Sequence, residues 1–403
     1  MKKKTGGVSL PAIEGGSPVR GEFLPFSPPS IGREEIDGVT AVLKSGWITR
    51  GRKCEEFERA LENYTGAKNA VVLSSATAGL FLSLAIAGIG EGDEVITTPY
   101  TFAATANVVL HAGATPVFAD IEPGTFLISA KEIEKSITPR TKALIPVDFA
   151  GDPVDIGELR AVAEEHGLRI IEDAAHAIGA GRKGVKVGNG PGVTVFSFHA
   201  VKNLTTGEGG AVLTDDEKLA RMFRLYSLHG QTKDALAKLQ AGGWRYDIEV
   251  PGYKCNMTDI QAAIGIGQLG RLDENVKTRG AIAKAYGEFL SGYEYVRVPG
   301  SARGFDHAWH LYPLLVDFTR LRLDRDRFIA ALAAENVSSN VHYIPVHMMS
   351  YYKKRFDYSP SDFPESLAVF DREVSLPIYP GMGEREVSDV LEACAKLFSY
   401  YQT

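Results

Sequence analysis

Between Val193 and Gly210, in VTVFSFHAVKNLTTGEGG, the sequence places a serine, a histidine and a lysine within six positions after an apolar strand. Lys202 comes just past the predicted end of that strand, where loss of hydration lowers the pKa of an amine until its neutral form becomes a nucleophile. Such a lysine can form a Schiff base with an aldehyde. Taken alone, a lysine in this position is more often a solvated surface group. The other parts of a Schiff-base site must therefore be found elsewhere in the chain.

A turn of small residues, SSATAGL from Ser74 to Leu80, joins a predicted strand to a predicted helix. The free backbone N–H groups and the positive dipole end of such a helix can hold a phosphate, and Thr77 can add a hydroxyl. Ser197 is placed to add a second hydroxyl to the same phosphate. The alternative is a tight packing turn that binds nothing.

Glu172 and Asp173 end the apolar strand of RIIEDAAHA. A carboxylate at the carboxyl end of a parallel strand lies where ligands bind, and it can pair with a protonated ring nitrogen. Asp173 and His176 could instead ligate a metal, but no further His, Cys or carboxylate cluster has metal-ligand spacing, so we expect no metal. Phe102, in PYTFAATAN, either stacks on a flat ring or belongs to the core.

A phosphate turn, an acid for a ring nitrogen and a lysine are the parts that a protein supplies to pyridoxal phosphate. Asp173 and Lys202 end or follow successive strands about 30 residues apart, so both can face one crevice. Together these features predict a pyridoxal phosphate site, although no single one of them would.

The elements that would position these residues alternate between strand and helix, as a mainly parallel, doubly wound α/β sheet requires. Seven strands are predicted, at 70–73, 94–97, 115–119, 142–147, 168–172, 193–197 and 210–213. Helices are predicted at 33–44, 54–64, 77–87, 102–112, 129–136, 155–166 and 215–227, and a long helical pattern covers 261–289.

Beyond this helical pattern, the sequence predicts short strands and amphipathic helices. We therefore expect three parts: an extended N-terminal arm at 1–30, a large domain at 31–272 and a smaller α+β domain at 273–403. Arms of this kind often pack on a neighbouring subunit. The loop GWITRG, which follows the first helix, is expected to expose Trp47.

Composition and charge indicate which partners and which cellular compartment to expect. A net charge of -6 and a pI of about 5.9, without long runs of like charge, argue against nucleic acid as the main partner. Cys54, Cys255 and Cys394 are too few and too scattered for a disulfide framework or a zinc cluster, so the cytoplasm is expected. The first residues do not form a secretory signal. The uncharged stretch Ala70 to Gly90 is split by polar residues into a strand, a turn and a helix, which argues against a membrane span.

Six segments resemble, in order, the motifs of the DegT/DnrJ/EryC1/StrS aminotransferases, which act on nucleotide-linked sugars: SSATAGL, TPYTFAATAN, IEDAAHAIGA, FSFHAVKNLTTGEGG, PGYKCNMTDIQAAIG and HAWHLY. The resemblance runs from about Phe23 to the last helix. It is closest to the enzymes that aminate C4 of UDP-linked 4-keto sugars, such as the UDP-4-amino-4-deoxy-L-arabinose and 4-amino-4,6-dideoxy-hexose transaminases. The resemblance implies the PLP-dependent transferase fold of aspartate aminotransferase, type I.

Carried over by position, the resemblance makes Lys202 the lysine of the internal aldimine and Asp173 the partner of the pyridine nitrogen. It places Ala76, Thr77 and Ser197 at the phosphate, Phe102 on the ring face and His176 beside the ring. Asn256 falls where a second subunit reaches the phosphate, which implies a homodimer with shared active sites. The sugar nucleotide would meet His307, His310, His342 and, in the GWITRG loop, Trp47. Each of these histidines could equally be a hydrogen-bonded core residue.

The resemblance implies amino transfer from L-glutamate, leaving 2-oxoglutarate and pyridoxamine phosphate, and then from pyridoxamine phosphate to a UDP-linked 4-keto sugar for surface polysaccharide, lipopolysaccharide or glycoconjugate synthesis. Amination at C3 by a relative of the same family is the nearest alternative. A sugar dehydratase of this fold has histidine where this chain has Lys202. A non-catalytic regulatory member would not need the complete set of Lys202, Asp173, Thr77 and Ser197.

Overall fold

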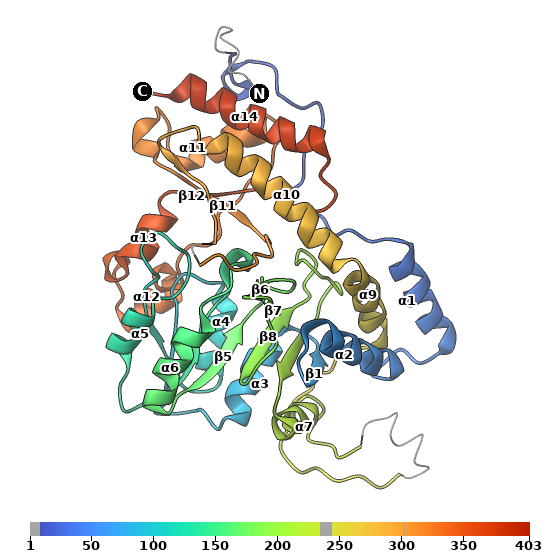
Figure 1. Cartoon of the computed structure of the whole chain (residues 1–403). Helices are drawn as coiled ribbons and strands as arrows, with labels where there is room; N and C mark the ends of the chain where they lie inside the picture. The colour runs from blue at the N-terminus through green and yellow to red at the C-terminus, as the bar shows by residue number, and fades with distance from the viewer. Residues whose placement is uncertain (1–8, 234–243, 302) are drawn as a thin grey trace.

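A computed structural model describes residues 9–233, 244–301 and 303–403 (Figure 1). Strands and helices alternate through the first two thirds of the chain, and the predicted α/β class is confirmed. The central sheet has seven strands in the order β1-β9-β8-β5-β4-β2-β3. Their bounds are β1 Asn69–Leu73, β2 Glu94–Thr97, β3 Thr115–Phe118, β4 Thr141–Ile145, β5 Arg169–Asp173, β8 Val193–Ser197 and β9 Gly210–Thr214. Only β9 runs antiparallel to its neighbours β1 and β8, so the sheet is mainly parallel, as predicted.

Helices cover both faces of this sheet because successive strand residues point to opposite sides. In β1, Val71 and Leu73 face a core shared with α3, α4 and α7, whereas Ala70 and Val72 face a core shared with α2 and α9. The helices of this part are α1 Arg33–Ser45, α2 Arg52–Thr65, α3 Ala76–Ile86, α4 Ala103–His111, α5 Ala130–Ser136, α6 Ile156–His166, α7 Glu217–Tyr226 and α9 Asp259–Gly270. Helices α1 to α7 each agree with a predicted helix to within a few residues, and α9 forms the first part of the predicted pattern over 261–289.

The C-terminal part builds its own core around a small antiparallel sheet of β10 Val296–Arg297, β11 Tyr312–Val316 and β12 Glu373–Leu376. Its helices are α10 Leu272–Leu290, α11 Arg325–Ala334, α12 Ser350–Phe356, α13 Pro364–Phe370 and α14 Glu384–Tyr401. Helix α10 contributes to two cores: Leu272 packs beneath the large sheet and Leu290 packs in the C-terminal core. The boundary near residue 272 stays a prediction.

Two details of the structure were not predicted. The helical pattern over 261–289 is divided into two helices, because Arg271 leaves helical geometry (φ -110°, ψ 2°) between α9 and α10. A short hairpin of β6 Gly181–Arg182 and β7 Val185–Lys186, between β5 and β8, was not predicted. Two-residue strands carry too little apolar alternation to be recognised from sequence.

The expected arm is ordered against its own chain over its described part, while residues 1–8 lie outside the described residues. Leu24 is buried in the C-terminal core and bridges Val337. The buried Glu335 carboxylate accepts hydrogen bonds from the backbone N–H groups of Ala12 (2.8 Å) and Val19 (2.9 Å).

Among the described residues, no helix combines the length and the apolar character that crossing a membrane requires.

Candidate active site

The register of the sheet brings distant segments of the predicted site into one row. Leu73 of β1 pairs with Gly210 of β9, and Gly210 pairs with Ser197 of β8. Val195, two residues before Ser197, pairs with Asp173 of β5. The turn after β1, the hydroxyl of Ser197 and the carboxylate of Asp173 therefore lie along the same edge of the sheet.

The predicted phosphate turn opens helix α3 with unused donors. Ser75 is the N-cap, and its hydroxyl accepts a hydrogen bond from the N–H of Ala78 (3.0 Å). The N–H groups of Ala76 and Thr77 stand in the first turn, where a helix has no acceptor for them, and no described residue accepts from them. A Cβ on Gly210 would lie 2.5 Å from the Ala76 nitrogen, so the strand start touches the turn directly.

Asp173 is a buried acid, 5 % exposed, held at both carboxylate oxygens. Oδ2 accepts from the Thr105 hydroxyl (2.9 Å) and Oδ1 accepts from the Ala175 N–H (3.2 Å). Burial raises the pKa of Asp173, while the two donors and the charge of Lys202 lower it. Thr105 was missed by the sequence analysis, although it lies three residues after Phe102 in the same motif.

The amine of Lys202 has no hydrogen bond or ion pair to any residue that the structure describes. Burial lowers the pKa of Lys202 to about 8, although the charge of Asp173 raises it. A neutral fraction of the amine is therefore available near neutral pH, as nucleophilic attack on an aldehyde requires. The charges of Lys202 and Asp173 act on each other's pKa, so the two side chains lie near each other.

Three of the predicted histidines share the surroundings of Lys202. Burial lowers the pKa of His176, His310 and His342, and the charge of Lys202 lowers each of them further. The rings of His176 and His310 lie 4.4 Å apart. Nδ1 of His176 accepts from the Ala150 N–H (3.1 Å), so the neutral ring carries its proton on Nε2.

Tyr343 is a second residue that the sequence analysis missed. Its hydroxyl lies 3.4 Å from Nε2 of His176, and the charge of Asp173 contributes to raising its pKa, after burial. Its ring faces Phe102 at 5.8 Å between centroids. Phe102 is 60 % exposed, so it does not belong to the core. The signal for Tyr343 was its place directly after His342.

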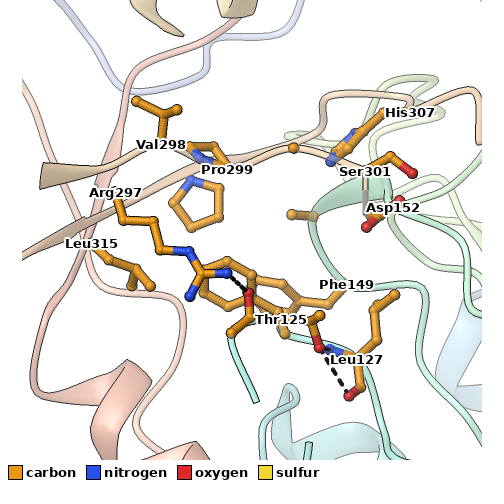
Figure 2. A pocket seen from close by; sticks show the side chains of 15 residues that line it. Thr125, Leu127, Phe149, Asp152, Arg297, Val298, Pro299, Ser301, His307 and Leu315 are labelled. Atoms are coloured by element: carbon orange, nitrogen blue, oxygen red, sulfur yellow. Dashed lines mark hydrogen bonds between the residues drawn. The ribbon is translucent and has the colours of Figure 1, made fainter. Parts of the chain in front are cut away.

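His307 is separate from this group. It lines a cavity of about 250 Å³ together with Asp152, Arg297 and Ser301, and Phe149 forms part of the wall (Figure 2). Burial alone lowers the pKa of His307 to about 3, with no contribution from Lys202. Its ring stacks on Trp309 at 3.9 Å. The expected grouping of His307 with His310 and His342 is therefore not what the structure shows.

The GWITRG loop is fixed to the segment that carries Asn256. Asp259 accepts hydrogen bonds from the N–H groups of Gly51 (2.8 Å) and Cys54 (3.0 Å). Trp47 is half-buried rather than exposed, because its indole N–H donates to the Arg50 carbonyl (3.0 Å) and its ring packs on Gly51.

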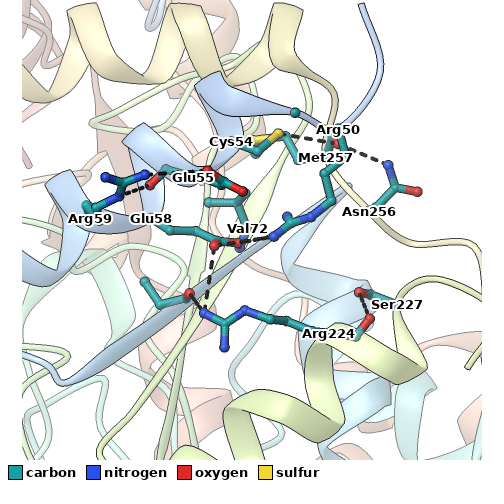
Figure 3. Close-up of polar contacts among 12 residues, drawn as sticks. Arg50, Cys54, Glu55, Glu58, Arg59, Val72, Arg224, Ser227, Asn256 and Met257 are labelled. Carbon is teal, nitrogen blue, oxygen red and sulfur yellow. Dashed lines mark hydrogen bonds and ion pairs between the residues drawn. The ribbon is translucent and has the colours of Figure 1, made fainter. Parts of the chain in front are cut away.

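Figure 3 shows Arg50 reaching the buried carboxylate of Glu58 (3.0 Å), which Arg224 approaches from the other side (3.7 Å).

Within the chain Asn256 bridges Leu73, directly before the phosphate turn. Its side-chain oxygen accepts from Lys254 at 2.5 Å. Its contact with the phosphate of a second subunit stays a prediction.

The donor set fits pyridoxal phosphate. Unused N–H groups at the start of α3 and the Ser197 hydroxyl suit a phosphate, the buried Asp173 carboxylate suits a protonated ring nitrogen, and the unpaired Lys202 amine suits an aldehyde. These three sites are carried by segments that the strand register brings together.

A comparison with known protein families shows to which family this chain belongs. The profile of the DegT/DnrJ/EryC1/StrS aminotransferase family matches residues 29–395. The chain belongs to this aminotransferase family. The resemblance recognised in the six sequence motifs is thereby confirmed, and so is the expectation of an enzyme.

Members of the DegT/DnrJ/EryC1/StrS family are similar to this chain over nearly its whole length. The spore coat polysaccharide biosynthesis protein SpsC of Bacillus subtilis is 48% identical over 381 residues, covering 93% of this chain and 97% of SpsC. A putative sugar aminotransferase of Streptococcus pneumoniae, Spr1654 in its PMP form, has a TM-score of 0.88 and 38% identity, covering 94% of this chain and 99% of Spr1654. Helicobacter pylori PseC, an aminotransferase involved in the biosynthesis of pseudoaminic acid, has a TM-score of 0.86 and 30% identity, with 94% and 100% covered. The predicted PLP-dependent transferase fold is confirmed.

Proposed function

We propose that this chain is a pyridoxal phosphate-dependent sugar aminotransferase that moves the amino group of L-glutamate to the C4 keto group of a UDP-linked sugar. Its product would serve polysaccharide synthesis, the role named for SpsC. The observation that supports the proposal is the strand register, which brings the phosphate turn, Ser197 and Asp173 to the same edge of the sheet. Lys202 is close enough to Asp173 for the charge of each to act on the pKa of the other.

The chain's residues would hold the cofactor at its two ends. The N–H groups of Ala76 and Thr77 and the hydroxyl of Ser197 would bind the phosphate at the start of α3. Asp173 would bind the ring nitrogen and keep a proton there, and Thr105 holds the carboxylate by a hydrogen bond (2.9 Å). When bound, pyridoxal phosphate supplies a sink for the electron pair left when the donor's Cα–H bond breaks.

Lys202 has two tasks in this proposal. Its amine, with a pKa lowered to about 8, would hold the cofactor through its aldehyde, and when free it would take up the Cα proton of the donor as a general base. Neutral His176, Nε2 of which lies near the Tyr343 hydroxyl, orients polar groups beside the ring without adding charge. Phe102 offers an exposed aromatic face.

The sugar nucleotide would bind between His310, His342, Tyr343 and the GWITRG loop with Trp47. The loop and Asn256 are expected to serve the active site of a partner subunit, so that a homodimer is the active unit. Relatives named sugar aminotransferases support the sugar substrate class. The nucleotide, the C4 position and glutamate are parts of the proposal, as are a cytoplasmic location and the absence of nucleic acid and membrane partners.

The test separates the two halves of the reaction. The purified holoenzyme is mixed with L-glutamate alone, and the loss of its visible absorption band and the release of 2-oxoglutarate are measured. It is then offered 4-keto and 3-keto sugars linked to UDP, dTDP and GDP, and the amino sugar is identified by mass spectrometry and NMR.

We expect the wild-type enzyme to react with glutamate and then with a UDP-linked 4-keto sugar. Lys202→Ala should carry out neither half of the reaction. A C3-amino product would replace the C4 assignment. An absorption band that glutamate leaves unchanged would point to a regulatory protein, and loss of a sugar hydroxyl without amination would indicate a dehydratase.

A further inference from the structure

Behind the candidate active site, on the opposite side of β5 from Thr105, lies a buried cluster of one cation and two carboxylates. Glu172 and Asp173 are successive strand residues, so their side chains point to opposite faces. Asp173 turns to Thr105, and Glu172 turns to Arg182 of the β6–β7 hairpin. The side chain of Glu172 is 5% exposed, and that of Arg182 is 14% exposed.

Arg182 joins the ends of two neighbouring strands. Its guanidinium donates to Glu172 and, at 3.2 Å, to Oδ1 of Asp148, the side chain of which is fully buried just after β4. Its Nε donates to the Val154 carbonyl (2.6 Å). Glu172 also accepts from the Thr194 hydroxyl of β8 (2.8 Å). One side chain therefore joins the end of β5 to the segment between β4 and α6.

The cluster is connected to Asp173 through the backbone as well. The N–H of Asp148 donates to the carbonyl of Asp173 (3.1 Å), and Val147 bridges Asp173. Moving Asp148 would therefore displace the backbone of the acid that is proposed to hold the ring nitrogen. The charge of Glu172 also acts on Asp173 and contributes to raising its pKa.

We propose that Arg182 is a positioning residue of the aminotransferase: by binding Asp148 and Glu172 it fixes Asp173 and offsets the negative charge behind the cofactor site. This inference rests on the proposed function, because it concerns the acid that faces the cofactor. Burial and the charge of Glu172 raise the pKa of Asp148 well above its ordinary range, so the two carboxylates together carry less than two full negative charges beside the one guanidinium. Without Arg182, the positive charge that faces these carboxylates would be lost.

The charged and titratable groups around the site determine the sign of the effect. The charge of Lys202 acts on Asp173, His176, His310 and His342, and the charge of Asp173 acts on Tyr343. The surroundings of Arg182 include Asp148, Glu172, Asp152 and Asp155, and Arg303 acts on Asp152. Removing a cation from this region favours the protonated form of every nearby group, and removing a carboxylate disfavours it.

The test is a pH titration of the visible absorption band of the holoenzyme, which reports protonation at the cofactor rather than turnover. In Arg182→Met we expect the midpoint of this titration to rise by about one pH unit. That is the shift that a unit charge causes at a distance of ~10 Å when the effective dielectric constant is ~20. In Glu172→Gln we expect it to fall. The double variant should return close to wild type, and Arg182→Lys should lie nearer to wild type than Arg182→Met.

Kinetics give a second readout. In Arg182→Met, kcat for the glutamate half-reaction should fall by about tenfold or more while KM changes little, because Arg182 touches neither substrate. The matched control is Lys396→Met, which removes another buried cation from an ion pair with Glu335 (2.9 Å), in the C-terminal part. That variant should lose thermal stability without moving the titration midpoint.

Unchanged midpoints in both Arg182→Met and Glu172→Gln, or shifts of the same sign, would overturn the inference. If Arg182→Met does not fold, the inference is tested by the other two variants. It then requires that the titration midpoint falls in Glu172→Gln and does not move in Lys396→Met. Failure of the proposed function looks different: wild-type protein reconstituted with pyridoxal phosphate would then show no lysine-dependent absorption band at all.

Discussion

The side chain of Asp173 shows how a buried acid can stay available for a cofactor. Its two hydrogen bonds come from Thr105 and the Ala175 N–H, and both favour the ionised form against the cost of burial. An ionised carboxylate can keep a ring nitrogen protonated, whereas an amide cannot. The carboxylate, rather than the shape of the residue, should therefore matter for the rate.

In Asp173→Asn we accordingly expect the half-reaction rate with glutamate to fall by at least about a hundredfold, with a much smaller loss of cofactor affinity. Stopped-flow absorbance and equilibrium fluorescence measure the two quantities. Thr105→Val is the graded companion, because it removes one hydrogen bond and keeps the acid. A variant that loses cofactor and rate in equal proportion would contradict this assignment.

The pKa of Lys202 makes a separate prediction for the protein without cofactor. Burial lowers this pKa to about 8, and only the neutral amine attacks an aldehyde. The rate at which the apoprotein captures pyridoxal phosphate should therefore rise from about pH 7 to about pH 9 and level off above the pKa. Stopped-flow absorbance measures it, with Lys202→Ala as the blank. A rate that does not depend on pH over this range would refute the lowered pKa.

Helix α3 and strand β9 form the phosphate end of the site by direct contact. Gly210 is required there because a Cβ would lie 2.5 Å from the Ala76 nitrogen and 2.8 Å from the Phe196 carbonyl oxygen. Both neighbours are backbone atoms, which cannot move aside without displacing the turn. Overpacking of this kind typically costs 1–3 kcal/mol.

In Gly210→Ala we thus expect the affinity for pyridoxal phosphate to fall by about tenfold or more, measured by fluorescence titration. Gly270→Ala is the control, since a Cβ at the end of α9 would meet nothing within 4 Å. Equal affinities in the two variants would show that the turn does not hold the phosphate.

The elements of the large sheet were predictable because their signals are local. The strands at 94–97 and 193–197 end where the apolar runs end, and Ser75 shows the preference of serine for an N-cap. Lys202 and Asp173 could be found because each directly follows or ends such a strand. The break at Arg271 left no comparable signal, since the apolar periodicity continues across it.

The residues that sequence did not reveal are those joined over long separations. Tyr343 reaches His176 across 167 positions, and Thr105 reaches Asp173 across 68. Nothing in a local pattern reports such pairs. His307 differs from His310, with which it was assigned on the resemblance of the motif HAWHLY: the charge of Lys202 acts on the pKa of His310, whereas burial alone acts on that of His307.

Taken as a whole, the molecule uses its N-terminal segment to complete the C-terminal core. The Glu335 carboxylate, fully buried, binds the N–H groups of Ala12 and Val19 and the amine of Lys396 (2.9 Å). Glu335→Ala leaves the buried Lys396 cation without its partner, which typically costs 3–5 kcal/mol. We expect a lower melting temperature and faster hydrogen exchange at residues 12–24. Glu288→Ala, on an exposed i,i+4 pair, is the control, and equal exchange in both variants would contradict this account.

The strand row that joins Leu73, Gly210 and Ser197 has a consequence for biogenesis. Leu73 is separated from Ser197 and from Gly210 by more than a hundred residues, so loop closure over that distance must precede any phosphate pocket. A nascent chain that has emerged only as far as β5 has the acid but neither Lys202 nor the strand that supports the turn. Capture of the vitamin-derived cofactor is consequently a late event in synthesis, and a ribosome-released fragment that ends before Gly210 should bind none.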